Sequence, residues 1–326
     1  MKLPTILRTV ALLVLLFWIF IFFAGEIQRH WIELSGSHLE IYWQYILLGV
    51  FFVILAYLVA TFAWQKAILL SSHKKLTFLE SIGLLNISQL TKYLPGKVWS
   101  YAIQMHLLSS HSISKTWILS VNVIMLLSLV SSATVIGLGY IVFANTYLSQ
   151  EIAVTLFIAS LLFYVFLVIG GTWSINLLVQ LANKFPKIQL VAINVPLSRM
   201  VTIHVLYLVS NLFFGLAGYF VAIGIGLPQD LSLIVPIAAS MLLSDTIGFF
   251  AFVVPGGIGV REGVMYAMLK TAIDIQTCFI LPIAFRLVTM TCDLLLGGFA
   301  MVLLNSFAKN SHKQLHLIKS GAENEK

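Results

Sequence analysis

Long runs of apolar residues constrain this chain more than any other feature of its sequence. A helix that crosses a bilayer needs roughly 20 mostly apolar residues, because the hydrocarbon core is about 30 Å thick and each residue rises about 1.5 Å. Six runs approach or exceed that length: residues 10–24, 44–63, 117–143, 154–173, 200–225 and 279–307. The sequence therefore predicts an all-α, polytopic transmembrane protein with six full spans.

The scarcity of charge supports this prediction. Only 10% of the 326 residues are charged and 60% are hydrophobic, whereas an ordinary soluble domain carries roughly 25% charged residues. A chain of this length with so few charges cannot cover a soluble surface. A soluble enzyme, a nucleic-acid-binding protein and a disordered chain are excluded together, so the net charge of +7 does not indicate a nucleic-acid partner.

Basic residues concentrate in alternate loops between the runs. They lie before the first run, after the second, between the fourth and fifth, and after the last: Lys2, Arg8, Lys66, Lys74, Lys75, Lys184, Lys187, Arg199, Lys309, Lys313 and Lys319. The intervening loops are mainly acidic, with Arg29 as their only basic residue. Because cytoplasmic loops carry the basic excess, we expect a cell-membrane protein with both termini in the cytoplasm. Residues 1–308 would form one transmembrane domain, and 309–326 a polar cytoplasmic tail without fixed structure.

Two further apolar stretches, 76–108 and 231–273, are interrupted by Pro-Gly pairs. Each has a polar residue two to three helical turns before its Pro-Gly pair: Asn86, Pro95 and Gly96 in the first stretch, Asp245, Pro255 and Gly256 in the second. A short amphipathic stretch and a long apolar helix follow each pair. This matched order suggests an internal duplication with halves 44–145 and 200–307.

Three clear spans separate the two Pro-Gly stretches, and an odd number of crossings inverts the second copy relative to the first. Pro-Gly frees backbone groups from a helix, which is tolerated in a membrane only inside protein or beside a water-filled cavity. We therefore predict two re-entrant segments, the first opening to the cytoplasm and the second to the outside. The alternative has eight spans, with 231–254 and 262–273 crossing fully.

The motif around the second break resembles a known family. The run 255–263, PGGIGVREG, and the earlier run 94–99, LPGKVW, are similar to the lysylphosphatidylglycerol synthase transmembrane-region family, with a likeness from about residue 44 to residue 307. The resemblance implies a multi-pass, flippase-like bacterial or archaeal membrane protein. In the best-known members this region moves aminoacylated phospholipid between leaflets. Those members also carry a soluble C-terminal aminoacyltransferase domain that this sequence lacks, so we do not expect it to synthesise lysyl-lipid.

Ionisable residues at membrane depth are candidates for a substrate site, because each costs about 2.5–3.5 kcal/mol on insertion scales. The candidates, with the glycines and proline of the break, are Asp245, Pro255, Gly256, Gly257, Arg261, Glu262, Arg286 and Asp293. The arginines would hold a phosphate and the carboxylates a cationic group. Alternatively, these residues form a buried charge network that fixes helix register. Asp245 and a lipid phosphate are both possible partners of Arg286, which shares a helix face with Asp293.

A second group of candidates surrounds the first break and would form a cytoplasmic mouth: Asn86, Lys92, Pro95, Gly96 and Lys97. Its lysines either gather anionic headgroups or anchor the chain at the interface. In the fifth span, His204 and Asn211 share a face, where interhelical hydrogen bonding is favoured over a proton relay.

The sequence favours a flippase that moves a phospholipid or lipid-linked molecule across the membrane. No catalytic constellation, metal-ligand histidine pair or nucleotide-binding glycine loop is found, and no cofactor is expected. The alternatives are an integral-membrane enzyme or an accessory subunit in lipid or envelope-glycan biosynthesis. The expected partners are membrane lipids and a lipid- or glycan-modifying enzyme.

Overall fold

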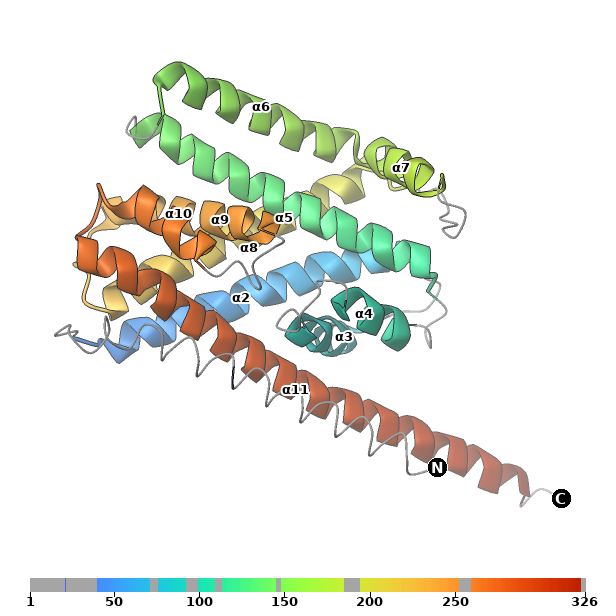
Figure 1. Cartoon of the computed structure of the whole chain (residues 1–326). Helices are drawn as coiled ribbons and strands as arrows, with labels where there is room; N and C mark the ends of the chain where they lie inside the picture. The colour runs from blue at the N-terminus through green and yellow to red at the C-terminus, as the bar shows by residue number, and fades with distance from the viewer. Residues whose placement is uncertain are drawn as a thin grey trace.

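The fold is a bundle of helices of unequal length (Figure 1). The computed structural model describes residues 21, 40–70, 76–91, 99–108, 113–144, 148–184, 194–251 and 259–323, and within these ranges it contains helices and no strand. In order along the chain the elements are α2 (Trp43–Ile68), α3 (Phe78–Leu90), α4 (Trp99–Leu108), α5 (Lys115–Ala144), α6 (Gln150–Ile169), α7 (Gly171–Ala182), α8 (Leu197–Gly224), the 3-10 turn η3 (Leu231–Leu233), α9 (Ile234–Phe250), α10 (Val260–Leu269) and α11 (Ile275–Glu323).

Six stretches of the described chain are long and apolar enough to cross a membrane. They are Trp43–Ile68, Lys115–Ala144, Gln150–Ile169, Leu197–Gly224, Leu231–Phe250 and Thr277–Val302. The prediction of an all-α polytopic membrane protein is thus confirmed. Of the predicted span 10–24 only Ile21 is described, and the stretch Leu231–Phe250 belongs to a segment predicted to be re-entrant.

One predicted span is divided between two helices in the structure. The apolar run 154–173 corresponds to α6, which begins earlier, at Gln150, and ends at Ile169. Gly170 then breaks the helix, and α7 begins at Gly171. Glycine has more backbone freedom than any other residue and is unfavourable inside a helix. The chain therefore changes direction inside the apolar run.

The segments around the Pro-Gly pairs form helical hairpins. Helices α3, α4 and α10 contain 13, 10 and 10 residues, or roughly 20, 15 and 15 Å at 1.5 Å per residue. None of the three can cross a hydrocarbon core of about 30 Å. Helix α10 is therefore too short for the full crossing of 262–273 in the eight-span alternative. The Pro-Gly pairs themselves lie outside the described residues.

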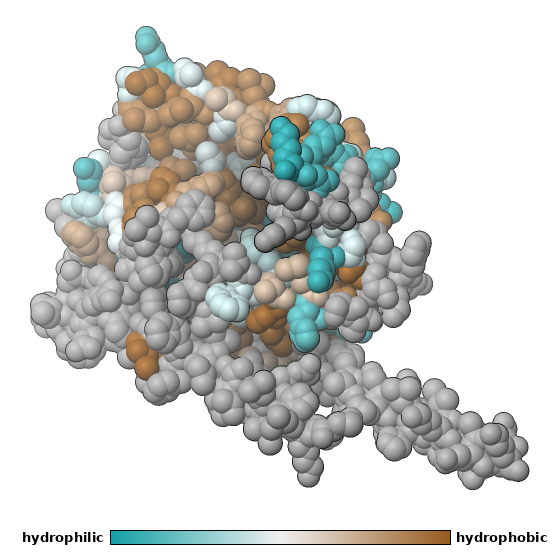
Figure 2. All heavy atoms as spheres, turned by 45° about the vertical axis from the view of Figure 1, so that its right-hand side comes forward, coloured by the Kyte–Doolittle hydropathy of each residue, from teal (hydrophilic) through white to brown (hydrophobic). Residues whose placement is uncertain are grey.

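The bundle has two ends of opposite charge. At one end the backbone N–H of Tyr42 donates to the carbonyl of Gly224 over 2.9 Å, and at the other the indole N–H of Trp117 donates to the carbonyl of Ile68 over 3.2 Å. The first, which we call the acidic end, carries Glu40, Glu151, Asp230 and Asp274; the second, the basic end, carries Lys66, Lys115, Lys184 and Arg199. Lys270 at the acidic end and Glu80 at the basic end are the exceptions. In Figure 2, hydrophilic side chains gather beside apolar surface where the basic end comes forward.

The two hairpins enter the bundle from opposite ends. The hairpin of α3 and α4 connects the end of α2 to the start of α5 at the basic end, while that of α9 and α10 connects the end of α8 to the start of α11 at the acidic end (Figure 1). Each hairpin has its own hydrophobic core. The basic-end core gathers residues such as Trp64, Leu85, Ile118 and Met200, and the acidic-end core gathers residues such as Ile223, Met241, Leu269 and Leu281.

Corresponding helices of the two predicted halves pack reciprocally. Helices α2 and α8 run antiparallel along each other, helix α3 packs on α11, and helix α9 packs on α5. A Cβ at Gly297 of α11 would lie 2.5 Å from Leu90 of α3, and one at Gly137 of α5 would lie 2.9 Å from Leu243 of α9. The two glycines are 160 residues apart, as are Pro95 and Pro255. Each half thus places its hairpin against the last long helix of the other half.

The predicted tail continues as a helix. Helix α11 extends over 49 residues to Glu323, or roughly 74 Å, and projects beyond the bundle (Figure 1). Residues 303–320 contain neither proline nor glycine, so no residue in this stretch terminates the helix. The expectation that 309–326 lacks fixed structure therefore differs from the structure over residues 309–323.

Candidate functional site

The second hairpin carries an ion pair between its two arms. Arg261, at the start of α10, contacts Asp245 of α9 with 2.8 Å between Nη1 and Oδ1, and the two side chains are 36% and 35% exposed. Gly248 makes room for this contact, because a Cβ there would lie 2.3 Å from Cγ of Arg261. The Nε of Arg261 is buried and has no hydrogen-bond partner among the described residues. The guanidinium therefore retains a donor that is not satisfied by the Asp245 contact.

A second ion pair connects the hairpin to α11. Arg286 donates from Nη1 to Oε1 of Glu262 over 3.0 Å, with side chains only 13% and 19% exposed. The other carboxylate oxygen of Glu262 accepts from the backbone N–H of Gly259 over 2.7 Å. Gly259 has φ +79°, a left-handed conformation that glycine adopts without strain, and it caps the N-terminus of α10. One carboxylate thus fixes both the start of α10 and its position on α11.

Of the site residues expected from the sequence, the structure brings four together in two ion pairs. Glu262 meets Arg286 and Asp245 meets Arg261, so the pairing of Asp245 with Arg286 considered above is replaced by these two contacts. Asp293 is buried on α11 at 5% exposure, two turns beyond Arg286. Pro255, Gly256 and Gly257 lie outside the described residues.

The expected cytoplasmic mouth falls mostly outside the described residues, which exclude Lys92, Pro95, Gly96 and Lys97. Asn86 is described and buried at 7% exposure. Its side-chain amide donates to the carbonyl of Ile82, one turn earlier, over 2.9 Å. In this structure Asn86 therefore bonds within its own helix.

The first hairpin contains a polar chain that the sequence reading missed. Gln104 of α4 donates to the hydroxyl of Ser88 on α3 over 3.0 Å and accepts from Asn122 of α5 over 2.7 Å. All three residues are at most 2% exposed, and Oδ1 of Asn122 has no partner among the described residues. This uncharged chain fastens the first hairpin to α5, just as Glu262 fastens the second to α11. The sequence did contain a signal for this polar chain, because the amide side chains Gln104 and Asn122 lie within apolar stretches.

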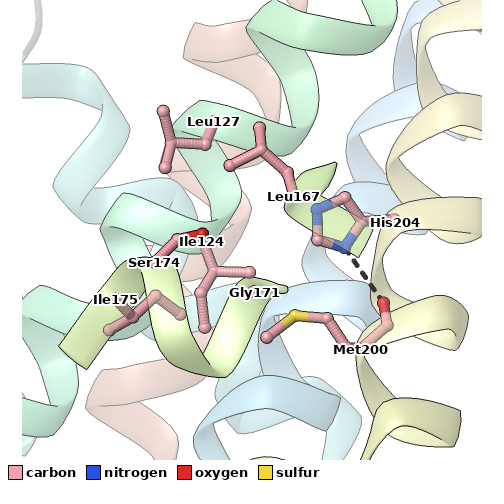
Figure 3. Close-up of a pocket in the computed structure, with 8 residues that line it drawn as sticks. All are labelled: Ile124, Leu127, Leu167, Gly171, Ser174, Ile175, Met200 and His204. Atoms are coloured by element: carbon pink, nitrogen blue, oxygen red, sulfur yellow. Dashed lines mark hydrogen bonds between the residues drawn. The ribbon is translucent and has the colours of Figure 1, made fainter. Parts of the chain in front are cut away.

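The face of α8 that carries His204 and Asn211 contacts α5. The side-chain amide of Asn211 donates to the carbonyl of Leu129 and to the hydroxyl of Ser132, at 2.9 and 2.8 Å, which confirms interhelical hydrogen bonding for this residue. Nδ1 of His204 bonds within its own helix, to the carbonyl of Met200, over 3.0 Å. The ring borders a small, mostly apolar pocket between α5, α6, α7 and α8 (Figure 3).

Metal ligands do not gather in the described part of the chain, where no group of three or more His, Cys, Asp or Glu side chains is placed to hold an ion. The chemistry of the site is therefore that of two arginines, two paired carboxylates and a buried aspartate. Such groups recognise phosphates and cationic groups through charge-assisted hydrogen bonds.

Comparison with known families gives the wider context of this site. The family model described as the lysylphosphatidylglycerol synthase TM region matches residues 5–297. The chain belongs to this family. The match includes both hairpins and the ion pairs between α9, α10 and α11, and it indicates a membrane protein of lipid or cell-envelope metabolism. No curated protein and no solved structure matched the chain.

Proposed function

We propose that this protein is a non-enzymatic flippase that moves a phospholipid or lipid-linked molecule across the cytoplasmic membrane. The observation that carries the proposal is the pair of salt bridges on the second hairpin, inside a bundle of largely apolar helices. Charges at membrane depth are costly and face a cavity or a partner. Here they lie beside a helix break, where the backbone also requires polar surroundings.

The two ion pairs differ in exposure, and this suggests how a headgroup enters. The Asp245–Arg261 pair is about one-third exposed, whereas the Glu262–Arg286 pair is nearly buried. A phosphate would first meet the guanidinium of Arg261, whose side chain is 36% exposed. It would then compete with Glu262 for the planar donor fork of Arg286. The released carboxylates are positioned to receive a cationic group on the same substrate.

Reciprocal packing of the two halves supports a rocking mechanism. Inverted repeats with broken helices near the membrane centre are a recurrent transporter design, in which the substrate site lies where the repeats meet. In this chain, each hairpin packs on the last long helix of the other half. A small rotation of one half against the other would move both hairpins and expose the charged site from alternate sides.

The charge difference between the two ends of the bundle supports the orientation in the membrane. Under the positive-inside rule, the basic end with Lys66, Lys115, Lys184 and Arg199 faces the cytoplasm. Helix α11 starts at the acidic end and continues past the basic end, so the C-terminus is proposed to be cytoplasmic. An enzyme that modifies a lipid or a glycan on the same leaflet is the proposed partner.

Reconstitution into proteoliposomes tests the proposal. A headgroup-labelled phospholipid would be followed with a membrane-impermeant quencher, and its chemical identity checked by mass spectrometry. We expect relocation without covalent change for the unaltered chain. A modified lipid would indicate an enzyme, and an unmoved lipid together with a co-purifying biosynthetic enzyme would indicate an accessory subunit.

Substitution of Arg286 tests whether the site is involved. Arg286→Gln removes the donor fork and should abolish relocation while the protein remains folded, as judged by monodisperse size-exclusion chromatography. Arg286→Lys retains the charge and should support partial relocation. Lys270→Gln, at an exposed position on the acidic end, is the matched control and should leave transport unchanged. Normal transport by Arg286→Gln would contradict the assignment of this site.

A further inference from the structure

Helix α7 is too short to cross the membrane and lies at the basic end of the bundle (Figure 1). Its 12 residues span roughly 18 Å. It begins directly after the break at Gly170 that ends α6. A helix of this length packs on the protein or lies along the membrane interface. Helix α7 has one face suited to each.

The inner face of α7 is fixed to the protein. Gly171 lies against Met200 of α8, so closely that a Cβ would be 2.7 Å from the terminal methyl. The hydroxyl of Thr172 donates to the carbonyl of Val195 over 2.8 Å and accepts from its N–H over 3.2 Å. Ile175 and Val179, at 3% and 4% exposure, complete the buried face. These contacts fix which residues of α7 face the protein, and they therefore also fix which residues form its outer face.

The outer face carries a continuous apolar stripe. Trp173, Leu177 and Leu181 are 61%, 40% and 45% exposed, and their spacing of four residues places them in one row along the helix. Phe166 of α6 packs edge-on against the Trp173 ring, with 5.8 Å between the ring centroids, and each of the three side chains is still at least 40% exposed. A row of this kind on a membrane protein lies against acyl chains, with tryptophan favoured near the headgroup level.

Two cations flank the stripe. Lys184 follows the end of α7 by two residues, and Arg199 precedes Met200, which covers the start of the helix. Both side chains are exposed and neither forms an ion pair with a described residue. Glu80, the described carboxylate at this end, is already bonded to the N–H and the hydroxyl of Thr77 at 2.7 and 2.9 Å. The two cations are therefore available to an anion from outside the chain.

We propose that the outer face of α7, together with Lys184 and Arg199, is a docking surface for an anionic phospholipid of the adjacent leaflet. The acyl chains would lie along Trp173, Leu177 and Leu181, and the phosphate would contact Arg199 or Lys184. Complementary charge favours an anionic lipid over a zwitterionic one, because a zwitterion carries its own cation beside the phosphate. This surface is separate from the charged site on the second hairpin, and its occupancy does not depend on transport.

Site-specific photo-crosslinking tests the proposal on the full chain in nanodiscs of equal phosphatidylglycerol and phosphatidylcholine. A photo-crosslinking residue at position 177 should capture phosphatidylglycerol in roughly tenfold excess. The same residue at position 162, on the exposed face of α6 where Leu162 is 64% exposed, should capture the two lipids in the bulk ratio. Equal capture ratios at the two positions would overturn the proposal.

The contribution of the cations is tested in the same experiment. Lys184→Gln with Arg199→Gln should reduce the excess of phosphatidylglycerol at position 177 to the bulk ratio. Lys270→Gln at the acidic end should leave the excess intact. An excess that survives the double substitution would overturn the assignment of the two cations. Because the readout is lipid capture, it remains informative whether or not the protein transports lipid, and loss of transport alone would not affect it.

Discussion

At the scale of single residues, the geometry of the candidate site is determined by which arginine pairs with which carboxylate. The sequence singled out the four residues that form the two ion pairs, because ionisable groups in apolar stretches are conspicuous. It did not identify the pairs, because Arg261 and Glu262 are neighbours on α10 whose side chains contact different helices. That divergence follows from helix geometry, because neighbouring residues of a helix project about 100° apart. Which helix each side chain meets depends on the packing of α9 and α11 around α10, and a residue pattern does not contain that packing.

Exchange of charges tests the pair between α9 and α10. Asp245→Arg places two cations side by side and should lower the midpoint of thermal unfolding, with a loss of about 1 kcal/mol because the pair is one-third exposed and partly screened. Adding Arg261→Asp restores opposite charges and should recover most of the loss. Stability would be followed by size-exclusion chromatography after heating. A double variant no more stable than the single one would show that this pair does not contribute.

The buried amide chain of the first hairpin supplies a second prediction at this scale. Gln104→Leu leaves Ser88 and Asn122 without their shared partner and should cost about 1–3 kcal/mol, the range for buried polar groups that lose a hydrogen bond. Gln180→Leu, on the exposed side of α7, is the matched control and should change stability little. Equal thermal midpoints for the two variants would contradict the structural role of the chain.

At the scale of elements, long helices were predictable from apolar runs and short ones were not. The run 154–173 continues through the break at Gly170, so hydropathy gave no reason to separate α6 from α7. The adjacent Gly170 and Gly171 were the available signal. The Pro-Gly pairs, by contrast, fall between α3 and α4 and between α9 and α10, as expected because proline removes a backbone donor and cannot continue a helix. Polarity misdirected the prediction for 309–323, where α11 continues as a helix through a stretch without proline.

The contact between α3 and α11 gives a prediction for packing between elements. Gly297→Ala forces a Cβ to within 2.5 Å of Leu90 and should destabilise the protein by about 1–3 kcal/mol, as for an overpacked core. Leu90→Ala in the same chain should recover part of this loss by opening space. Gly298→Ala is the matched control, since a Cβ there meets nothing within 4 Å. Thermal midpoints of the four chains would measure the effect, and equal losses at positions 297 and 298 would contradict it.

At the scale of the whole molecule, the proposed rocking mechanism requires the two halves to move against each other. A disulfide between Leu90→Cys and Gly297→Cys joins the hairpin of one half to the last helix of the other. It should stop lipid relocation in proteoliposomes, and reductant should restore it. Cys278 and Cys292 are buried and not joined in a disulfide, so both would be replaced by alanine beforehand. Undiminished transport in the oxidised state would rule out rocking at this contact.

The two larger hydrophobic cores have a consequence for the proposed transport. Each of them surrounds one hairpin, so the proposed rocking motion would loosen one core while the other remains packed. A passage opened from the cytoplasmic side would end at the packed side chains of the other core, and the reverse would hold from outside. Water and a headgroup could then enter from either side without a continuous aqueous path. The proposed mechanism would thus move a polar headgroup while protons and other ions stay on their own side of the membrane.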